Sequence, residues 1–304
     1  MSEMLALSLW ATNMAAPPAT RGAWLAQVEG VMDETSARGG QLLLMPEYIS
    51  RTWLPYCGPD LPLSHEVAAM AAEGAELLPA LQSLVDAKGL SMLAGTWPVK
   101  TLAGYSNRAY FLRPGAESIT HDKLCLTPLE RNDQGWQLSE GRTVRIFRWN
   151  GLTCAMLICL DVELPAVSLL LAREAPDLDL LLVPSTTRRL SGASRVFGCA
   201  KARAIELMTC VAVTGSIGLT PLKVPRPSVS GAAVYLPCEP ELGERGVYAD
   251  TGIYDHTEGI GPLLHVSDLP VGWVRSLRHD RGAEVWPGCW MPQNLRLVRD
   301  ADCH

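Results

Sequence analysis

This sequence of 304 residues lacks the features that define several large classes of protein. It contains no low-complexity tract, heptad pattern or internal repeat, which excludes fibrous and largely disordered architectures. No apolar run is long enough to cross a membrane, since the one around residues 178–183 is far shorter than the roughly 20 residues that a spanning helix needs. The opening segment, MSEMLALSLW, has neither a cationic leader nor a cleavage site. We therefore expect a cytoplasmic protein with no membrane partner.

Clusters of positive charge and of metal ligands are also missing. The 26 lysine and arginine residues are scattered through a chain of net charge −6 and form no basic patch interleaved with aromatics, so we expect no nucleic-acid partner. No C-x-x-C motif occurs, and the six histidines never approach one another or a cysteine at ligand spacing, so we expect no metal site. The nine cysteines are an odd number and fall mostly in apolar stretches, which is typical of reduced thiols.

The residues that are abundant form an alternating pattern of strands and helices. Apolar residues make up 48% of the chain and charged residues 19%, as in compact globular proteins. Apolar stretches at residues 4–10 and 41–45 predict two strands, and Trp24 and Val28 lie between them at helical spacing. Glu47 comes just past the second strand, at the kind of sheet edge where α/β proteins bind ligands.

The next segment predicts a helix followed by two strands. Residues 65–88 have helical apolar periodicity, and we predict that this helix is broken near Gly74 and Pro79. Residues 90–96 and 105–112 follow as strands.

A long loop is predicted after these strands. Residues 119–137 have neither strand nor helix periodicity and contain Pro128 and Gly135. Lys123 and Glu130 are therefore predicted to lie on an ordered loop, and long loops inside compact domains tend to be functional.

A hairpin and a sharp turn are predicted near the middle of the chain. Strands at residues 143–149 and 152–158 flank an Asn-Gly dipeptide at 150–151, which favours positive φ at both turn positions. The second strand runs into Cys159, and residues 165–175 resemble a helix that opens with proline. Strand, cysteine, turn and helix is the order of a nucleophile elbow, in which a tight turn presents the side chain beside free backbone N–H groups.

The rest of the chain repeats the alternation of strand and helix. The remaining predicted elements are strands at residues 178–183, 210–216, 229–236 and 263–266 and a helix at residues 194–208. Residues 221–227 and 237–254 are rich in loop signals. No sharp change of composition divides the chain, so residues 1–304 are predicted to form a single α/β domain.

Cys159, Glu47 and Lys123 together would form a nucleophilic site. A carboxylate can accept the proton of a thiol, and a nearby ammonium can hold the resulting negative charge. Attack on an amide carbon would then give a tetrahedral species, and Lys123 and the backbone N–H of Leu160 could stabilise the negative charge that develops there or on the nitrogen of an attacked nitrile. Glu47 could serve as base and then acid, and burial beside Glu130 would raise its pKa toward the value that this role needs.

Three separated blocks of sequence resemble the nitrilase superfamily of carbon–nitrogen hydrolases. These blocks are LLLMPEY at residues 42–48, HDKLCLTPLER at residues 121–131 and AMLICLDVELPAVSLLLAREAPDLDLLLVPS at residues 155–185. Further similarity lies in CAKARAIEL at residues 199–207 and in the strand around Ser230. The resemblance covers most of the chain, and its strength comes from three blocks in order and at similar spacing.

The resemblance implies a four-layer α-β-β-α sandwich, in which two sheets lie between helical layers. It implies Glu47, Lys123 and Cys159 as the catalytic residues, and Glu130 as a second glutamate that positions the substrate or helps proton transfer. It also implies a homodimer or higher homo-oligomer, and neither a metal nor an organic cofactor. By this resemblance the protein is a hydrolase that cleaves a C–N bond other than a peptide bond, through a thioester.

The residues around the cysteine favour one kind of substrate. Many nitrile hydrolysers of the family have Trp and Glu after the nucleophile, whereas this chain has Leu160 and Asp161, so we expect an amide or ureide rather than a nitrile. Arg188 or its neighbour Arg189 could bind a substrate carboxylate through two hydrogen bonds. The candidate substrate-binding residues are Tyr48, Leu160, Thr186, Thr187 and Arg188.

Other interpretations of the same residues remain open. The three groups could hydrolyse a nitrile or transfer an acyl group, and a catalytically silent scaffold could keep the same fold. Asp161 is expected to brace the turn through hydrogen bonds to the backbone, and Arg203 and Glu206 are expected to form a structural pair. Cys154 and Cys210 are expected to be buried as small apolar residues.

Overall fold

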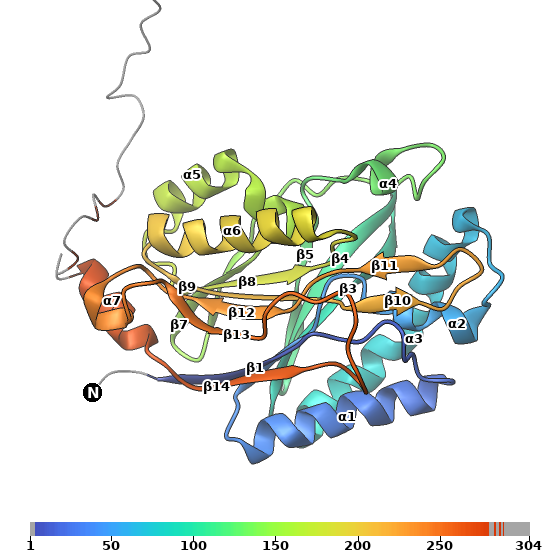
Figure 1. Cartoon of the computed structure of the whole chain (residues 1–304), viewed down its shortest axis with the longest axis horizontal. Helices are drawn as coiled ribbons and strands as arrows, with labels where there is room; N and C mark the ends of the chain where they lie inside the picture. Colours follow the sequence, from blue (N-terminus) through green and yellow to red (C-terminus); the bar gives the residue numbers. More distant parts are fainter. Residues whose placement is uncertain (1–3, 280–282, 284–285, 287, 289–304) are drawn as a thin grey trace, which may run out of the picture.

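Two six-stranded sheets form the centre of the molecule. The structure is a computed structural model, and it describes residues 4–279 together with 283, 286 and 288. The first sheet has the order β14-β1-β2-β3-β4-β5 and the second the order β13-β12-β9-β8-β7-β6. Helices α1 and α3 cover the outer face of the first sheet, and α5 and α6 cover that of the second (Figure 1). The α/β class and the four-layer arrangement predicted from the sequence are confirmed.

The bounds of the elements are as follows. The first sheet contains β1 (Leu5–Trp10), β2 (Leu42–Leu44), β3 (Ser91–Thr101), β4 (Gly104–Arg113), β5 (Ala116–Asp122) and β14 (Leu263–Leu269). The second contains β6 (Ile146–Trp149), β7 (Leu152–Met156), β8 (Leu180–Ser185), β9 (Cys210–Gly215), β12 (Ala232–Tyr235) and β13 (Val247–Asp250), and a separate ribbon pairs β10 (Gly218–Thr220) with β11 (Arg226–Ser228). The helices are α1 (Arg21–Ala37), α2 (Leu54–Cys57), α3 (Leu63–Lys88), α4 (Pro128–Arg131), α5 (Pro165–Glu174), α6 (Leu190–Glu206) and α7 (Val271–His279), with 3₁₀ turns η1 (Ile49–Thr52), η2 (Cys159–Glu163) and η3 (Pro240–Leu242).

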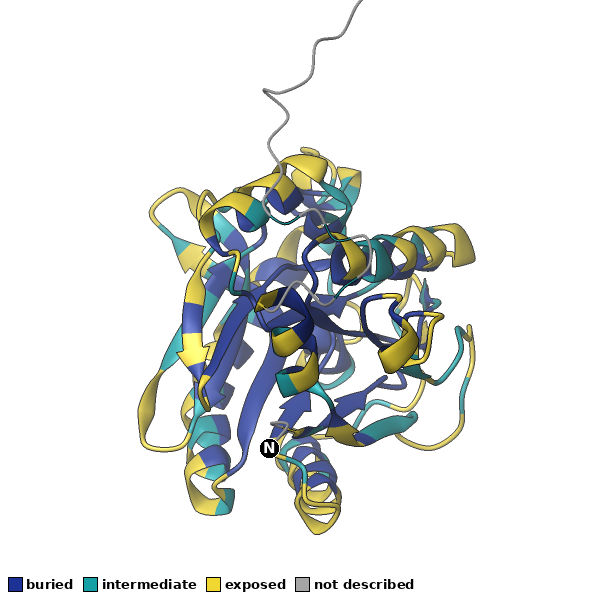
Figure 2. Ribbon diagram, turned by 90° about the vertical axis from the view of Figure 1, so that its left-hand side faces the viewer, coloured by how far each residue is buried: buried dark blue, intermediate teal, exposed yellow. Residues whose placement is uncertain are grey.

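The central strands are apolar on both faces because both faces are covered. Leu42 and Leu44 of β2 belong to the core between the two sheets, while Leu43 packs beneath α1 and α3. Successive side chains of a strand point to opposite faces, so a short apolar run serves two layers at once. In Figure 2 the central strands are dark blue, while the outward faces of the helices are largely yellow.

Three strand ends, one from the first sheet and two from the second, lie together at one edge of the fold. β2 pairs in parallel with β1 and β3, and β8 pairs in parallel with β7 and β9. The chain leaves β2 toward Glu47, β7 toward Cys159 and β8 toward Thr186. Because parallel strands end at the same edge of a sheet, these residues are set where the chain opens into loops.

The predicted hairpin is confirmed. Trp149 pairs with Leu152 across the turn, and Asn150 and Gly151 both have positive φ, at 47° and 76°. Asn-Gly is the dipeptide that tolerates this conformation best, and the turn fixes the register of the strand that leads to Cys159.

The predicted break in the third helix is wrong. α3 is continuous over its 26 residues, with Pro79 inside it. Gly74 serves close packing, because a Cβ there would lie 2.4 Å from Cδ1 of Trp97 on β3. Glycine therefore lets the helix approach the sheet closely and does not end the helix.

Two predicted loops are partly wrong. Within residues 119–137, β5 extends to Asp122 and Glu130 lies on the short helix α4. Within residues 237–254, β13 forms the edge of the second sheet. Both strands are half-exposed at sheet edges, so they lack the continuous apolar signal of the central strands.

No helix in the described part of the chain combines the length and the apolar character needed to cross a membrane. The single domain over residues 1–304 stays a prediction, since both ends of that range lie outside the described residues.

Candidate active site

Glu47 lies fully buried where the chain leaves β2. Its Oε1 atom accepts hydrogen bonds from Lys123 Nζ at 2.8 Å and from Asn107 Nδ2 at 2.9 Å. Its Oε2 atom accepts one from the backbone N–H of Thr186 at 2.8 Å. Donors on three different elements therefore fix the orientation of this carboxyl group.

The segment that carries Glu47 depends on a glycine opposite it. Gly95 on β3 has a φ of +72°, and a Cβ at this position would lie 2.3 Å from the carbonyl oxygen of Pro46. No other residue could sit this close without displacing the backbone that leads to Glu47. The next residue, Tyr48, also has a positive φ of 50°, and its N–H donates to Thr96 Oγ1 at 2.9 Å.

Lys123 places one ammonium between two carboxyl groups. Its Nζ atom lies 2.8 Å from Glu47 Oε1 and 2.8 Å from Glu130 Oε2, and its side chain is 1% exposed. Burial works to lower the pKa of Lys123, but the charges of Glu130 and Glu47 outweigh burial and hold this pKa well above its usual value. The lysine is therefore a permanent cation in the site.

Glu130 is held by its own helix and by Tyr48. It closes a capping box at the start of α4, where its Oε2 accepts from the backbone N–H and the hydroxyl of Thr127 at 2.8 and 2.7 Å. The Tyr48 hydroxyl donates to Glu130 Oε1 at 2.5 Å. Burial works to raise the pKa of Glu130, but Lys123 and these hydrogen bonds lower it below its usual value. Glu130 is therefore the charged partner of the lysine.

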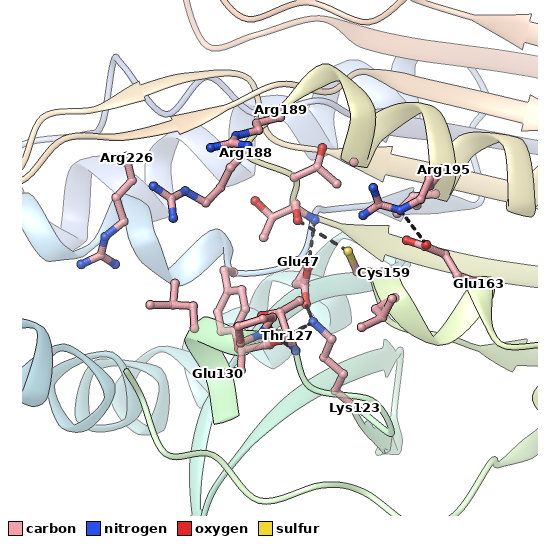
Figure 3. Close-up of a pocket in the computed structure, with 18 of the residues that line it drawn as sticks. Glu47, Lys123, Thr127, Glu130, Cys159, Glu163, Arg188, Arg189, Arg195 and Arg226 are labelled. Atoms are coloured by element: carbon pink, nitrogen blue, oxygen red, sulfur yellow. Dashed lines mark hydrogen bonds and ion pairs between the residues drawn. The ribbon is translucent and has the colours of Figure 1, made fainter. Parts of the chain in front are cut away.

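Cys159 sits in a strained turn with its thiol toward the pocket (Figure 3). Its φ is 50°, in the left-handed region that side chains other than glycine rarely adopt. Ser185 Oγ donates to Sγ at 3.6 Å, and the thiol donates to the carbonyl of Thr186 at 3.5 Å. Burial and the charge of Glu47 raise the pKa of the thiol well above its usual value. The thiol is thus neutral until a neighbouring base takes its proton.

Asp161 ties this turn to the segment that carries Lys123. Its carboxylate accepts from the backbone N–H of Cys125 at 2.8 Å and of Leu124 at 3.1 Å, and from that of Ile158 at 3.2 Å. One carboxylate therefore holds the segment just after Lys123 and the residue just before Cys159. The expected bracing role of Asp161 is confirmed.

Glu47 has the electrostatics of a proton carrier near neutral pH. Burial raises its pKa to about 7, against the opposing charge of Lys123. A group with this pKa can both accept and return a proton at physiological pH.

A cavity of about 560 Å³ opens onto these groups. The five predicted substrate-binding residues all line it: Tyr48, Leu160, Thr186, Thr187 and Arg188. Arg203 and Glu206, expected to be a structural pair, form an ion pair away from this cavity. Cys154 and Cys210 are fully buried in the core, as expected.

Three residues of the site escaped the sequence analysis. Asn107 on β4 donates to both Glu47 and Glu130, and its own carbonyl accepts from the N–H of Lys123 at 2.9 Å. Asn107 lies in a segment that has the pattern of an ordinary strand, and no sequence motif distinguishes it. Arg51 and Arg226 line the cavity from two loop-rich segments whose conformation the sequence does not determine.

In the described part of the chain, no three His, Cys, Asp or Glu side chains are grouped so as to hold a metal ion.

Solved structures of an amidase are similar in fold to this chain. The amidase from Nesterenkonia sp. AN1, in a variant with the acetamide moiety of fluoroacetamide attached to its active-site cysteine, matches with a TM-score of 0.65 and 18% identity over 92% of this chain and 96% of that one. The same amidase in complex with butyramide matches with a TM-score of 0.64 and 19% identity, over 92% and 97% of the two chains. A further structure of it, described as from the nitrilase superfamily, also has a TM-score of 0.64. This chain has the nitrilase-superfamily fold.

Sequence comparison also finds a curated relative. A probable hydrolase of Bacillus subtilis (strain 168), YhcX, is 25% identical over 270 residues, which is 86% of this chain and 50% of that protein. The chain therefore spans about half the length of this curated relative. No protein-family model matches the chain. In the nitrilase-superfamily fold, the cavity described above lies where the parallel strands of the two sheets end.

Proposed function

We propose that this protein hydrolyses the C–N bond of a small, non-peptide amide through a thioester on Cys159. The observation that carries the proposal is the convergence of a thiol, a carboxyl group with a pKa of about 7 and a permanent ammonium in one buried pocket. Together they supply a nucleophile, a base to activate it and a cation to stabilise the negative charge that forms when a thiol attacks an amide.

In the first half of the reaction, Glu47 takes the proton of the Cys159 thiol as sulfur attacks the amide carbon. The new C–S bond forms, and the carbonyl electron pair moves onto oxygen. Lys123 and the backbone N–H of Leu160 stabilise this oxyanion, a contribution worth roughly 3–4 kcal/mol per donor. The C–N bond then breaks, and Glu47 gives its proton to the leaving nitrogen.

In the second half, Glu47 takes a proton from water as the water oxygen attacks the thioester carbon. The C–S bond breaks, the acid product leaves, and the proton on Glu47 returns to the sulfur. One carboxyl group thus acts as base and acid in turn. Glu130 contributes by keeping Lys123 charged and in place, since it accepts two hydrogen bonds from the ammonium at 2.9 and 2.8 Å.

The comparisons favour an amide over the alternatives. The amidase of similar fold has been solved with butyramide and with an acetamide adduct on its cysteine. Nitrile hydrolysis and acyl transfer by the same three groups remain alternative outcomes. Ureide substrates, a homodimer and a cytoplasmic location stay predictions.

Ammonia release from a panel of amides and nitriles tests the proposal. We expect the wild type to release ammonia from short amides, and Cys159→Ala to release none above the uncatalysed rate. Cys57→Ala is the matched control, because Cys57 is an exposed free cysteine outside the cavity.

Intact-mass measurement follows the intermediate. We expect an acyl adduct on the wild type that is absent from Cys159→Ala. Equal ammonia from the two proteins would remove Cys159 from the mechanism. No ammonia and no adduct from any substrate would favour the silent scaffold. If added hydroxylamine takes the acyl group to give a hydroxamate in place of most of the free acid, acyl transfer would be favoured.

A further inference from the structure

The charge of the cavity is opposite to that of the whole chain. Six cationic side chains line it, against the three acidic ones of Glu47, Glu130 and Glu163. The chain as a whole has a net charge of −6. Lys123 is already paired with two of the acids, so the excess positive charge belongs to the arginines. A cleft with an excess of one sign of charge raises the local concentration of ligands of the opposite sign.

Arg226 is held rigidly in the wall of this cavity. It forms a buried ion pair with Glu66 through Nη2, and its guanidinium carbon lies 5.6 Å from the centre of the Trp136 ring. Glu66 also accepts from Trp136 Nε1 at 3.1 Å, so both of its oxygens are used in orienting the cavity wall. The Nη1 atom of Arg226 is buried and has no hydrogen-bond partner among the described residues.

Arg51 adds a second buried cation directly behind Arg226. It is 4% exposed and donates to the Arg226 carbonyl oxygen at 3.1 Å and to Thr220 Oγ1 at 2.8 Å. Burial lowers the pKa of Arg51 to about 10, the charges of Arg226 and Arg188 act in the same direction, and those of Glu66 and Glu47 oppose them. Glu66 balances the charge of Arg226 but not those of Arg51 and Arg188 as well, so this group of cations favours a further anion.

Arg188 completes the group from the end of β8. Its side chain is exposed, and within residues 4–279 no hydrogen bond or ion pair engages its guanidinium. Figure 3 shows Arg188 and Arg226 on one side of the pocket, while Arg195, which pairs with Glu163 at 3.0 Å, lies on the other side beyond Cys159. Arg188 therefore faces the same region of the pocket as Arg226.

From these positions we infer that Arg188 and Arg226 bind a carboxylate at the far end of the substrate, with Arg51 as a positioning residue behind Arg226. This inference rests on the proposed function and names its substrate class: short linear amides or ureides that carry a carboxylate. A guanidinium presents two parallel N–H donors that match the two oxygens of a carboxylate. Trp136 and Tyr48, whose rings lie 4.8 Å apart, give the carbon chain between the two ends an apolar wall.

A pair of substrates that differ only at the far end tests the inference. Succinamate has a carboxylate where butyramide has a methyl group, so the ratio of their kcat/KM values reports the subsite alone. We expect the wild type to prefer succinamate, and Arg188→Ala to lower this ratio by about tenfold to a hundredfold, the range expected for a lost charge-assisted hydrogen bond. Arg226→Lys keeps the charge beside Glu66 but loses the two-pronged geometry, and it should lower the ratio as well.

Arg195→Ala is the matched control, since it removes the same charge from the opposite side of the pocket. Its ratio should stay at the wild-type value. An equal fall in Arg195→Ala and Arg188→Ala would replace the subsite with a general effect of positive charge and overturn the inference.

Binding to Cys159→Ala separates this inference from the proposed function. We expect calorimetry to show tighter binding of succinamate than of butyramide to this variant, and the difference to disappear when Arg188→Ala is added. If the wild type hydrolyses both amides without preference, the carboxylate subsite is wrong and the proposed function stands. If the preference in binding is present but the wild type releases no ammonia, the subsite stands and the proposed function is wrong.

Discussion

The side-chain amide of Asn107 donates to Glu47 Oε1 at 2.9 Å, the same oxygen that Lys123 contacts. The amide also reaches Glu130 Oε1 at 3.3 Å, so one neutral group joins the two glutamates of the site. Because this amide is a neutral donor, it stabilises both carboxylates without adding positive charge. The positive charge beside the two glutamates therefore comes from Lys123, and this is the charge that can stabilise an oxyanion.

Replacing Asn107 by alanine should therefore change the pH profile as well as the rate. Loss of a donor to the charged form raises the pKa of a carboxyl group, so the acidic limb of kcat/KM should move to higher pH, with a fall in kcat of about tenfold or more. Steady-state kinetics between pH 5 and 9 measure both effects. A lower rate with an unmoved acidic limb would show that Asn107 acts only on structure.

Glu47 should impose its own pH dependence on the wild type. The free enzyme needs Glu47 as a carboxylate to take the thiol proton, and burial raises its pKa to about 7. We therefore expect kcat/KM to rise with pH and to level off above an apparent pKa near 7. Glu47→Gln keeps the shape but cannot exchange a proton, and it should lower kcat by about a hundredfold to ten-thousandfold. A rising limb of unchanged position and height in Glu47→Gln would assign the titration to another group.

Asp161→Ala should destabilise the fold strongly. The substitution leaves the N–H groups of Leu124, Cys125 and Ile158 without their acceptor, at a cost of roughly 1–3 kcal/mol for the buried Ile158 and less for each of the two half-buried residues. Asp161→Asn keeps one acceptor oxygen and should lose less stability. Urea unfolding measures both variants, and Asp255→Ala, at an exposed position, is the control. Equal stability of Asp161→Ala and Asp161→Asn would remove the bracing role.

Gly74→Ala and Gly30→Ala should have opposite effects on stability. A Cβ at Gly74 would lie 2.4 Å from Trp97, so alanine there forces α3 away from β3 and should cost about 1–3 kcal/mol. A Cβ at Gly30 meets nothing within 4 Å, and alanine in the interior of α1 should stabilise by about 0.5–1 kcal/mol. Thermal and urea unfolding of the two variants give the comparison. Destabilisation by both would mean that helix propensity does not govern α1.

Local patterns in the sequence were sufficient for the strands that are buried on both faces and for the hairpin before Cys159. Local patterns were insufficient where the conformation of a residue depends on a contact with a residue that is distant in the sequence. Gly74 resembled a helix break because its partner across the helix–sheet interface, Trp97, is invisible along the chain, and the exposed Pro79 lies within the continuous helix. The edge strands β5 and β13 have half-exposed residues, so their apolar signal is weak.

The sequence by itself determined which chemical groups the site could use, because Glu47, Lys123 and Cys159 follow strand ends or sit in blocks that mark those positions. Only the tertiary structure decided how these groups meet, since Asn107 lies 60 residues from Glu47 and 23 from Glu130 in the chain yet joins both. Arg51 and Arg226, 175 residues apart, likewise meet in the cavity wall. Charges and hydrogen bonds act over a few ångströms of space, and the fold sets those distances between residues that the chain keeps far apart.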